Sequence, residues 1–327
     1  MKTKYEELKK ILGDRLKGNV MLAPFTTFKI GGPADLFYEA RTVDELVQAV
    51  AEAGKLKIPV FVLGGGSNLL IGDKGVRGLV VKNSTSKIVI RGVKGSFAAG
   101  KSGSGLIYVE ADSGVILNQL VRFTIEEGLS GLEMHLGLPG TVGGAVFMNS
   151  KWTKPAGAVG DVVYQANIFR RTNEMVTVPK AYFNFGYDSS VLQKSGDLVL
   201  SVVFRLAKST KDKLWEAANG SIVYRRLTQP QGVFTSGCTF RNLSKAEALA
   251  AATPNQITSA GFLLDHAGLK GLTVGGAEVS KMHANFIVNK NHATAFQVVQ
   301  LIELCRGRVR EKFGVTLKEE IVRIGEF

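Results

Sequence analysis

The spacing of hydrophobic residues in the first 70 positions changes from helical to strand-like. Apolar side chains between residues 5 and 16 recur every three or four positions, which predicts a short amphipathic helix. Thr42 and Glu45 have the spacing of a capping box, so a second helix is expected to begin there and to end at Gly54. The apolar run at residues 58–63 predicts a buried strand that leads into a glycine-rich turn. An α/β unit is therefore expected at the N-terminus.

Farther along, short alternating runs and isolated amphipathic stretches predict an α+β organisation rather than a doubly wound sheet. The predicted strands of this middle region are residues 78–81, 87–91, 106–111, 162–170 and 198–206. Helices are expected at residues 116–127 and 210–226. A last unit has predicted strands at residues 238–241 and 285–288 and predicted helices at residues 256–266 and 293–313. Surface turns are expected at residues 83–86 and 100–105.

The composition is typical of a globular protein of two or three domains. The 327 residues are 45% hydrophobic and 21% charged, which excludes wholesale disorder and a fibrous protein. The N-terminus lacks the apolar core of a secretory signal, and no segment approaches the ~18 apolar residues of a membrane span. Cys238 and Cys305 are far apart and form no metal-ligand pattern with histidine, so we expect no disulfide, no metal and a cytoplasmic location. Cys305 lies on an apolar stripe of the last helix and is expected to be core and inert.

A net charge of +13 indicates an anionic partner. Lys and Arg are scattered along the chain, without a nucleic-acid-binding motif or aromatic residues interleaved with basic ones. We therefore expect no nucleic-acid partner and interpret the charge as a field that steers phosphorylated small molecules. Nothing in the sequence predicts an oligomer, so a monomer is the default.

Two glycine-rich segments are candidates for binding a diphosphate. In residues 64–70, Gly-Gly-Gly-Ser-Asn-Leu-Leu, the glycines allow the backbone to approach phosphate oxygens closely. This segment is neither a Walker loop nor a Rossmann fingerprint, and by itself a plain tight turn explains it equally well. Residues 138–145, Leu-Pro-Gly-Thr-Val-Gly-Gly-Ala, again expose backbone donors at a predicted helix start. Two such loops in one chain favour a large dinucleotide cofactor.

Five motifs follow one another along the chain. They are residues 27–34 (Thr-Phe-Lys-Ile-Gly-Gly-Pro-Ala), 63–70, 131–145, 237–242 (Gly-Cys-Thr-Phe-Arg-Asn) and 283–289 (His-Ala-Asn-Phe-Ile-Val-Asn). In this order they resemble the UDP-N-acetylenolpyruvoylglucosamine reductase (MurB) family over residues 20–325. Each motif is weak alone, but five in the family's order are specific. The short stretch between Tyr187 and Leu206 is similar to the subgroup without the inserted tyrosine loop.

The resemblance implies an α+β protein with a two-part FAD-binding domain of the vanillyl-alcohol-oxidase (PCMH) type and a C-terminal α+β substrate domain. The corresponding division is residues 1–82, 83–226 and 227–327. FAD would be held by Gly64, Gly65, Gly66, Ser67, Asn68 and Leu69 and by Gly140, Thr141, Gly144 and Ala145. The implied enzyme is UDP-N-acetylmuramate dehydrogenase, which uses NADPH to reduce UDP-GlcNAc-enolpyruvate to UDP-N-acetylmuramate for peptidoglycan. Hydride would pass through N5 of FAD to C3 of the enolpyruvyl group, and a proton would go to C2.

The resemblance also implies catalytic residues. Cys238 stands where the family has a proton-donating serine, and a thiol, with an ordinary pKa of about 8.5, is a stronger acid than an alcohol. The alternative is a small buried thiol in a strand. Glu320 matches the family's acidic glutamate, and Glu319 takes its place if the alignment shifts by one residue. The alternative for Glu320 is a solvated carboxylate at a strand start.

Asp188 is the main departure from the family. It replaces the arginine that the resemblance assigns to the enolpyruvyl carboxylate, and its own charge would repel that group. Either another cation takes over, or the protein is an FAD-binding paralogue with lost or altered reductase activity. The candidate cations are Arg225, Arg226, Arg241 and Lys270. We expect activity to survive in reduced form.

The remaining site candidates concern the substrate. Tyr187 and Ser190 match the family's positions around Asp188 and are expected to line the site. Groups that suit the UDP diphosphate are Arg241, Asn242, Lys270 and His283. A satisfied structural role is the alternative for His283.

Overall fold

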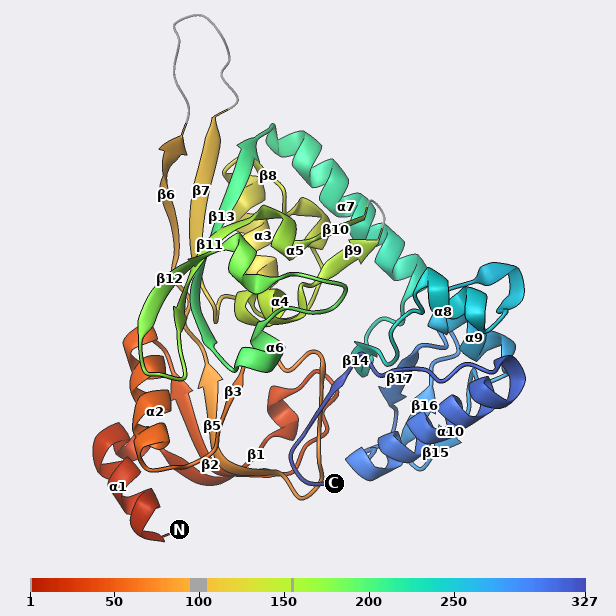
Figure 1. Ribbon diagram of the computed structural model, residues 1–327, viewed down its shortest axis with the longest axis horizontal. Coiled ribbons are helices and arrows are strands. Elements are labelled where there is room, and N and C mark those ends of the chain that lie inside the picture. The colour runs from red at the N-terminus through yellow and green to blue at the C-terminus, as the bar shows by residue number, and fades with distance from the viewer. Residues whose placement is uncertain (1, 95–104, 154–155) are drawn as a thin grey trace, which may run out of the picture. The chain divides into compact units, whose positions relative to one another are not determined.

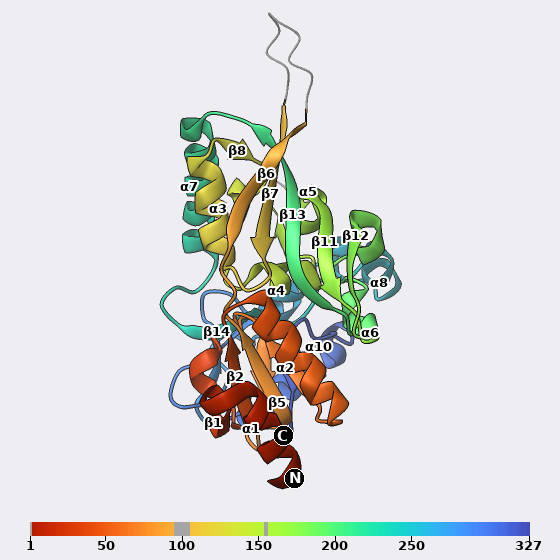
Figure 2. The same cartoon turned by 90° about the vertical axis from the view of Figure 1, so that its left-hand side faces the viewer.

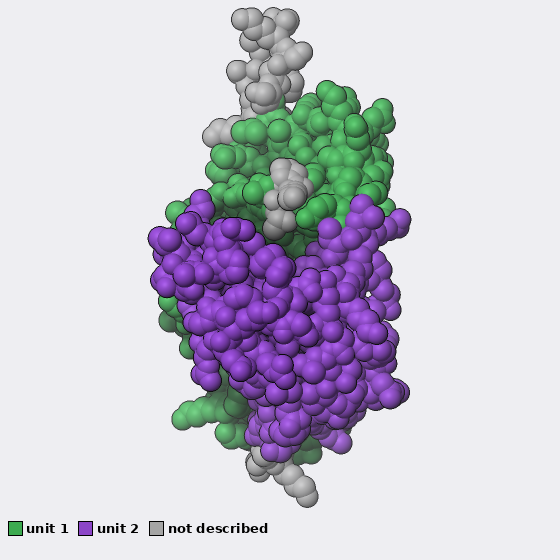
Figure 3. Space-filling model, turned by 90° about the vertical axis from the view of Figure 1, so that its right-hand side faces the viewer, with its two compact units in different colours: residues 1–16, 38–65, 81–225 green, residues 17–37, 66–80, 226–327 purple. Residues whose placement is uncertain are grey.

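The computed structural model describes residues 2–94, 105–153 and 156–327 (Figure 1). The predicted turn at residues 100–105 lies outside these residues except for its last position. The chain forms two compact units, coloured separately in Figure 3. Unit 1 comprises residues 1–16, 38–65 and 81–225, and unit 2 comprises residues 17–37, 66–80 and 226–327. The three-part division expected from the sequence stays a prediction.

The two N-terminal helices belong to unit 1. Helix α1 (Lys2–Leu12) is followed by a 3-10 turn (Gly13–Arg15), and it ends before residue 16 because Gly13 takes a positive φ of 71°. Helix α2 (Val43–Lys55) begins as predicted, since the Thr42 hydroxyl accepts a hydrogen bond from the Glu45 N–H at 3.2 Å. The Glu45 carboxylate accepts from the backbone of Arg41 rather than from Thr42, so the reciprocal half of the capping box is shifted by one residue.

A four-stranded sheet has the order β1 (Lys17–Met21), β2 (Pro33–Ala40), β5 (Val76–Asn83) and β3 (Val60–Leu63). The predicted strands at residues 58–63 and 78–81 correspond to β3 and β5. The boundaries between the two units fall within β2 and β5. Strand β4 (Leu69–Ile71), which follows the first glycine loop, pairs in parallel with β18 (Val322–Ile324) near the C-terminus. The pairing fixes the end of that loop in unit 2.

The larger sheet of unit 1 runs in the order β12 (Met175–Pro179), β11 (Val163–Phe169), β13 (Leu198–Lys208), β7 (Leu106–Asp112) and β6 (Ile88–Lys94). A short strand, β8 (Leu129–Ser130), pairs with β13. Alternate residues of β7, such as Val109, point into a core shared with α3 (Leu117–Glu126), α4 (Val142–Met148) and α7 (Lys211–Thr228). Figure 2 shows α3 and α7 on one side of this sheet. Its other face carries polar residues such as Glu110.

Short elements of unit 1 connect these layers. They are a 3-10 turn (Glu133–His135), β9 (Lys151–Thr153), β10 (Ala156–Ala158), α5 (Val159–Val162), a second 3-10 turn (Lys180–Phe183) and α6 (Leu192–Ser195). Helix α4 is the helix whose start the second glycine loop predicted, and it ends at Asn149, which has a left-handed φ of 48°.

In unit 2, a sheet has the order β14 (Phe234–Cys238), β17 (Phe286–Asn289), β16 (Ala277–Val279) and β15 (Thr273–Val274). It shares a core with α9 (Ala260–His266) and α10 (Ala295–Phe313), and the short helix α8 (Lys245–Ala250) precedes them in the chain. The strand predicted at residues 238–241 instead ends at Cys238, because Gly237 (φ +85°) lies where the register with β17 shifts. The helix predicted from residue 256 starts only at Ala260, since Asn255 and Gln256 are left-handed.

The surface turn predicted at residues 83–86 is wrong for two of its residues. Asn83 and Thr85 are buried, at 4% and 0% exposure. The Asn83 side chain donates to the Ser113 hydroxyl at 2.8 Å, and Thr85 accepts from the Gly114 N–H at 3.0 Å. These polar side chains are buried because each has a hydrogen-bond partner, a condition that residue type alone does not reveal.

Helix α10 confirms the predicted apolar stripe. Val298, Leu301, Ile302 and Cys305 are buried on it. Burial raises the pKa of the Cys305 thiol to about 12, so this group stays protonated at physiological pH. Among the helices in the described parts of the chain, none has the length and hydrophobicity to cross a membrane.

The two thiols should therefore differ in reactivity. Cys305 is 1% exposed, whereas Cys238 is only partly buried. A thiol reagent at mildly alkaline pH is expected to label Cys238 in the native protein and to reach Cys305 only after unfolding. Mass spectrometry of labelled peptides measures this, and C238A provides the unlabelled control. Rapid modification of Cys305 in the folded protein would contradict the burial described here.

Candidate functional site

The two predicted glycine loops lie against each other in unit 1. A Cβ placed on Gly65 would come within 2.7 Å of the Gly140 Cα, and one on Gly64 within 2.6 Å of the Thr141 hydroxyl. Residues with side chains would therefore force the loops apart. The Lys82 ammonium donates to the Gly64 carbonyl at 2.8 Å and fixes the loop from the side of β5. Close backbone approach without Cβ atoms is the geometry that a bound diphosphate requires.

Helix α4 organises the second loop. Thr141 is its N-cap residue, and its hydroxyl accepts from the Gly144 N–H at 3.4 Å. Ala145 lies one turn into the helix, and its side chain is buried in the core. Its N–H donates to the Thr141 carbonyl. Of the second-loop candidates, Gly140 and Gly144 keep part of their surface accessible, whereas Thr141 and Ala145 are both buried.

The remainder of the first loop belongs to unit 2. Gly66 has a φ of +62°, and a Cβ there would meet the Phe25 carbonyl at 2.3 Å. Ser67 follows, and the Asn68 side chain then donates to the Glu320 carbonyl at 3.1 Å. Leu69 pairs with Val322. The loop thus leads directly to the predicted acidic residue near the C-terminus.

Cys238 and Glu320, 82 positions apart, are brought together in unit 2. The Glu320 N–H donates to the carbonyl of Thr239, the residue after Cys238, at 2.8 Å. A bridge between Phe240 and Glu319 continues this pairing beyond the end of β14. The two predicted catalytic residues therefore stand on neighbouring extended segments.

Glu319 is held in a structural role. Its carboxylate accepts from Arg306 at 2.5 Å and from Arg323 at 2.6 and 2.8 Å. Because successive side chains of an extended segment point to opposite sides, Glu320 faces away from this arginine pair. The geometry therefore favours Glu320 over Glu319 as the candidate acid.

The departure at Asp188 has a partner that the sequence analysis did not identify. Asp188 is 4% exposed, and both of its carboxylate oxygens lie 2.5 Å from the Lys151 ammonium. Tyr187 is half-exposed, and the Ser190 hydroxyl donates to the Phe147 carbonyl at 2.8 Å. Lys151 neutralises Asp188, and it is not one of the four cations that the sequence analysis named as replacements for the arginine.

The four substrate-binding candidates of unit 2 differ in whether their polar side-chain groups already have partners within the protein. The Arg241 Nε is buried and has no hydrogen-bond partner within the described residues, as expected of a group that binds an absent anion. The Asn242 side chain accepts from the Ala260 N–H at 3.0 Å, and Lys270 pairs with Asp265 at 2.6 Å. His283 accepts from the Asn285 N–H at 3.2 Å, and burial lowers its pKa. Arg241 is thus the best placed of the four.

Two residues near the glycine loops were missed by sequence reasoning. Burial lowers the pKa of Lys82, whose contact with Gly64 has no motif to mark it. His135 is 3% exposed, and neither of its ring nitrogens has a partner in the described parts of the chain. Burial lowers the pKa of His135, which favours the neutral imidazole. The nearness of His135 to the second glycine loop in sequence was the only available signal.

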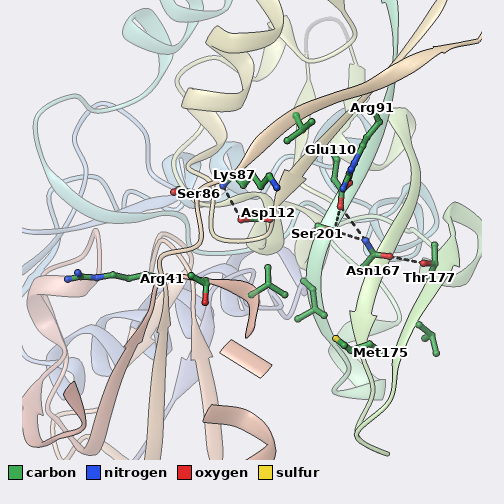
Figure 4. A pocket seen from close by; sticks show the side chains of 15 residues that line it. Arg41, Ser86, Lys87, Arg91, Glu110, Asp112, Asn167, Met175, Thr177 and Ser201 are labelled. Atoms are coloured by element: carbon green, nitrogen blue, oxygen red, sulfur yellow. Dashed lines mark hydrogen bonds and ion pairs between the residues drawn. The ribbon is translucent and has the colours of Figure 1, made fainter. Parts of the chain in front are cut away.

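A cavity of about 690 Å³ lies on the polar face of the large sheet of unit 1 (Figure 4). Its side chains bond to one another: the Ser201 hydroxyl donates to Glu110 at 2.6 Å, and the Asn167 amide donates to Ser201 at 2.9 Å. Thr177 donates to Asn167 at 2.7 Å. None of the predicted site residues lines this cavity, so we assign the candidate site elsewhere.

No group of three or more His, Cys, Asp or Glu residues in the described ranges could hold a metal ion. The donor set instead fits a dinucleotide. Glycine backbone at Gly65 and Gly140, the Thr141 hydroxyl and the neighbouring Lys82 offer N–H, O–H and positive charge to phosphate oxygens. These groups lie in the part of the chain that the resemblance assigns to FAD.

Comparison with known proteins gives the same division of roles. Residues 34–178 match the family model of the FAD binding domain, and residues 229–324 match that of the UDP-N-acetylenolpyruvoylglucosamine reductase C-terminal domain. Among curated proteins, the UDP-N-acetylenolpyruvoylglucosamine reductase of Prochlorococcus marinus is 35% identical over 95% of this chain and 98% of the relative. The enzyme of the same name from Anoxybacillus flavithermus is 35% identical over 98% of both chains.

Solved structures agree with this result. The crystal structure of UDP-N-acetylenolpyruvylglucosamine reductase from Thermus caldophilus has a TM-score of 0.73 at 32% identity, covering 95% of this chain and 99% of that one. A VAO-type flavoprotein from Myceliophthora thermophila has a TM-score of 0.55 at 9% identity, covering 95% and 85%, which confirms the predicted fold class. The chain has a flavin-binding fold, two adjacent glycine loops and relatives that match nearly its whole length. It therefore belongs to the UDP-N-acetylenolpyruvoylglucosamine reductase family and takes FAD as its cofactor.

Proposed function

We propose that the protein reduces the enolpyruvyl ether of UDP-GlcNAc-enolpyruvate to UDP-N-acetylmuramate, with NADPH as the reductant. The observation that carries the proposal is the backbone hydrogen bond between Glu320 and Thr239, which holds the candidate acid beside the candidate proton donor Cys238. Membership of the reductase family supports the same substrate. A cytoplasmic location and a monomeric state stay predictions.

FAD, held by the glycine loops around Gly65 and Gly140, would supply hydride to the enolpyruvyl group. Negative charge then develops on C2 and on the adjoining carboxylate. The Cys238 thiol donates a proton to C2, which completes the saturated product, and solvent returns a proton to the sulfur. Glu320, as the candidate acid, hydrogen-bonds the carboxylate and stabilises the developing charge. Arg241, whose buried Nε has no partner in the described residues, binds the UDP diphosphate.

The competing function is an FAD-binding protein without reductase activity, which the exchange of arginine for Asp188 favours. The pairing of Asp188 with Lys151 weakens this alternative, because a cation from strand β9 neutralises the carboxylate. Purified protein distinguishes the two functions. Both predict a flavin absorbance spectrum, but only the reductase consumes NADPH in proportion to added UDP-GlcNAc-enolpyruvate. NADPH oxidation that is independent of this compound would refute the proposal.

A further inference from the structure

The segment that carries Asp188 is a rigid turn in unit 1. Gly186 and Ser189 are joined by a backbone hydrogen bond of 3.0 Å, and Asp188 within the turn has a left-handed φ of 49°. Asp and Asn tolerate this conformation better than other side chains. The Gln193 side chain donates to the Asp188 carbonyl at 3.0 Å. The Asp188 side chain therefore points in a fixed direction.

This turn is attached to the carboxyl end of helix α4. The Asn149 side chain donates to the Gly186 carbonyl at 2.9 Å, and Ser190 donates to the Phe147 carbonyl at 2.8 Å. The same helix begins at Thr141 in the second glycine loop. From Thr141 to Asn149 the helix rises by about 12 Å, so one short helix connects the second glycine loop with this turn.

Lys151 brings a positive charge to this turn. Its ammonium lies 2.5 Å from each Asp188 oxygen and 3.5 Å from the centre of the Tyr187 ring. The Lys151 side chain keeps 24% of its surface exposed, whereas that of Asp188 keeps 6%. The carboxylate is thus almost completely covered, whereas part of the lysine side chain stays exposed. An ammonium has three N–H donors, so a lysine that binds one carboxylate can also bind a second.

We propose that Lys151 binds the carboxylate of the enolpyruvyl group and that Asp188 is a positioning residue, which holds the ammonium beside Tyr187. The inference rests on the proposed function. Like a single arginine at position 188, the Asp188–Lys151 pair places a cation at this turn. The net charge of the pair is lower by one than that of the arginine. The substrate carboxylate is therefore held less tightly than by an unpaired cation.

The test compares variants in one background, so that no buried carboxylate is left without a partner. D188N keeps the shape and the left-handed turn while it removes the negative charge. K151M/D188N then differs from D188N only in the ammonium, and K151R/D188N conserves that charge. The substrate is titrated into the oxidised FAD-loaded protein, and its Kd is read from the change in flavin absorbance. Steady-state KM and the rate of flavin reduction by NADPH are measured alongside.

D188N is expected to bind UDP-GlcNAc-enolpyruvate as tightly as the unmodified protein or more tightly. K151M/D188N should bind it roughly 10- to 100-fold more weakly than D188N, and K151R/D188N should retain binding. The rate of flavin reduction should be equal in all of them. K55M/E52Q removes an ion pair of 2.6 Å from helix α2 as a matched control and should leave the Kd unchanged.

Equal substrate affinity in D188N and K151M/D188N would overturn the inference, because Lys151 would then only neutralise Asp188. Weak binding by K151R/D188N would also overturn it, since the charge would not be the property that matters. Failure of the proposed function gives a different result: the unmodified protein itself would neither bind nor reduce UDP-GlcNAc-enolpyruvate.

Discussion

Replacing Cys238 by alanine is expected to lower turnover of UDP-GlcNAc-enolpyruvate by about 10²- to 10⁴-fold, the usual contribution of a positioned general acid. The thiol stands at the end of β14, directly before the Thr239 carbonyl that bonds to Glu320. Without it, C2 must be protonated by water that the site does not position. Stopped-flow kinetics measure the effect, because reduction of FAD by NADPH should stay unchanged while its reoxidation by the substrate becomes slow.

Two variants control this experiment. C238S places the family's serine at the position and should recover much of the lost rate. C305A removes the other thiol, which is buried on α10 in the core of unit 2, and should leave turnover per folded molecule unchanged. Reoxidation of C238A by substrate at the original rate would exclude Cys238 as the proton donor.

The second large effect is expected at Gly65. In G65A the new methyl group would lie 2.7 Å from the Gly140 Cα, so the two glycine loops must separate. Backbone donors that both loops direct at one diphosphate would then no longer converge. Overpacking of this kind costs roughly 1–3 kcal/mol, which corresponds to roughly 5- to 150-fold weaker binding of FAD. Purified G65A should therefore have lost most of its flavin absorbance.

G54A is the matched control for this prediction. Gly54 lies in α2 of the same unit, and a Cβ there meets nothing within 4 Å. Alanine favours helix at such a position, so the variant should keep its flavin and be equally or slightly more stable. The ratio of flavin to protein absorbance measures both variants. Full flavin content in G65A would show that the loops do not act together on the cofactor.

The elements predicted well from the sequence are those with a strong local pattern. Strand β7 alternates apolar and polar residues, and α10 carries an apolar stripe over five turns, so both could be located without knowledge of their partners. Strands β4 and β18 have three residues each and form only because they pair with each other across the length of the chain. No local window contains that information.

The same distinction applies to the site. The glycine loops could be predicted to act together because unusual composition marks each of them, and Cys238 and Glu320 because family motifs do. Lys151 could not, since nothing near it differs from an ordinary surface lysine. The reversed charge at Asp188 indicated that a cation must lie nearby. Which cation this is depends on the contact with Lys151, which is 37 positions away in the sequence. Long-range charge compensation leaves no local pattern.

The pairing of β4 with β18 has a consequence for synthesis of the protein. Asn68 leaves the ribosome 252 residues before Glu320, whose carbonyl it binds, and Leu69 likewise precedes its strand partner Val322. Until then, the segment after the first glycine loop lacks its neighbouring strand. FAD retention should thus be acquired late, and a premature stop before β18 would yield a polypeptide that is prone to degradation even though most of its core has been translated.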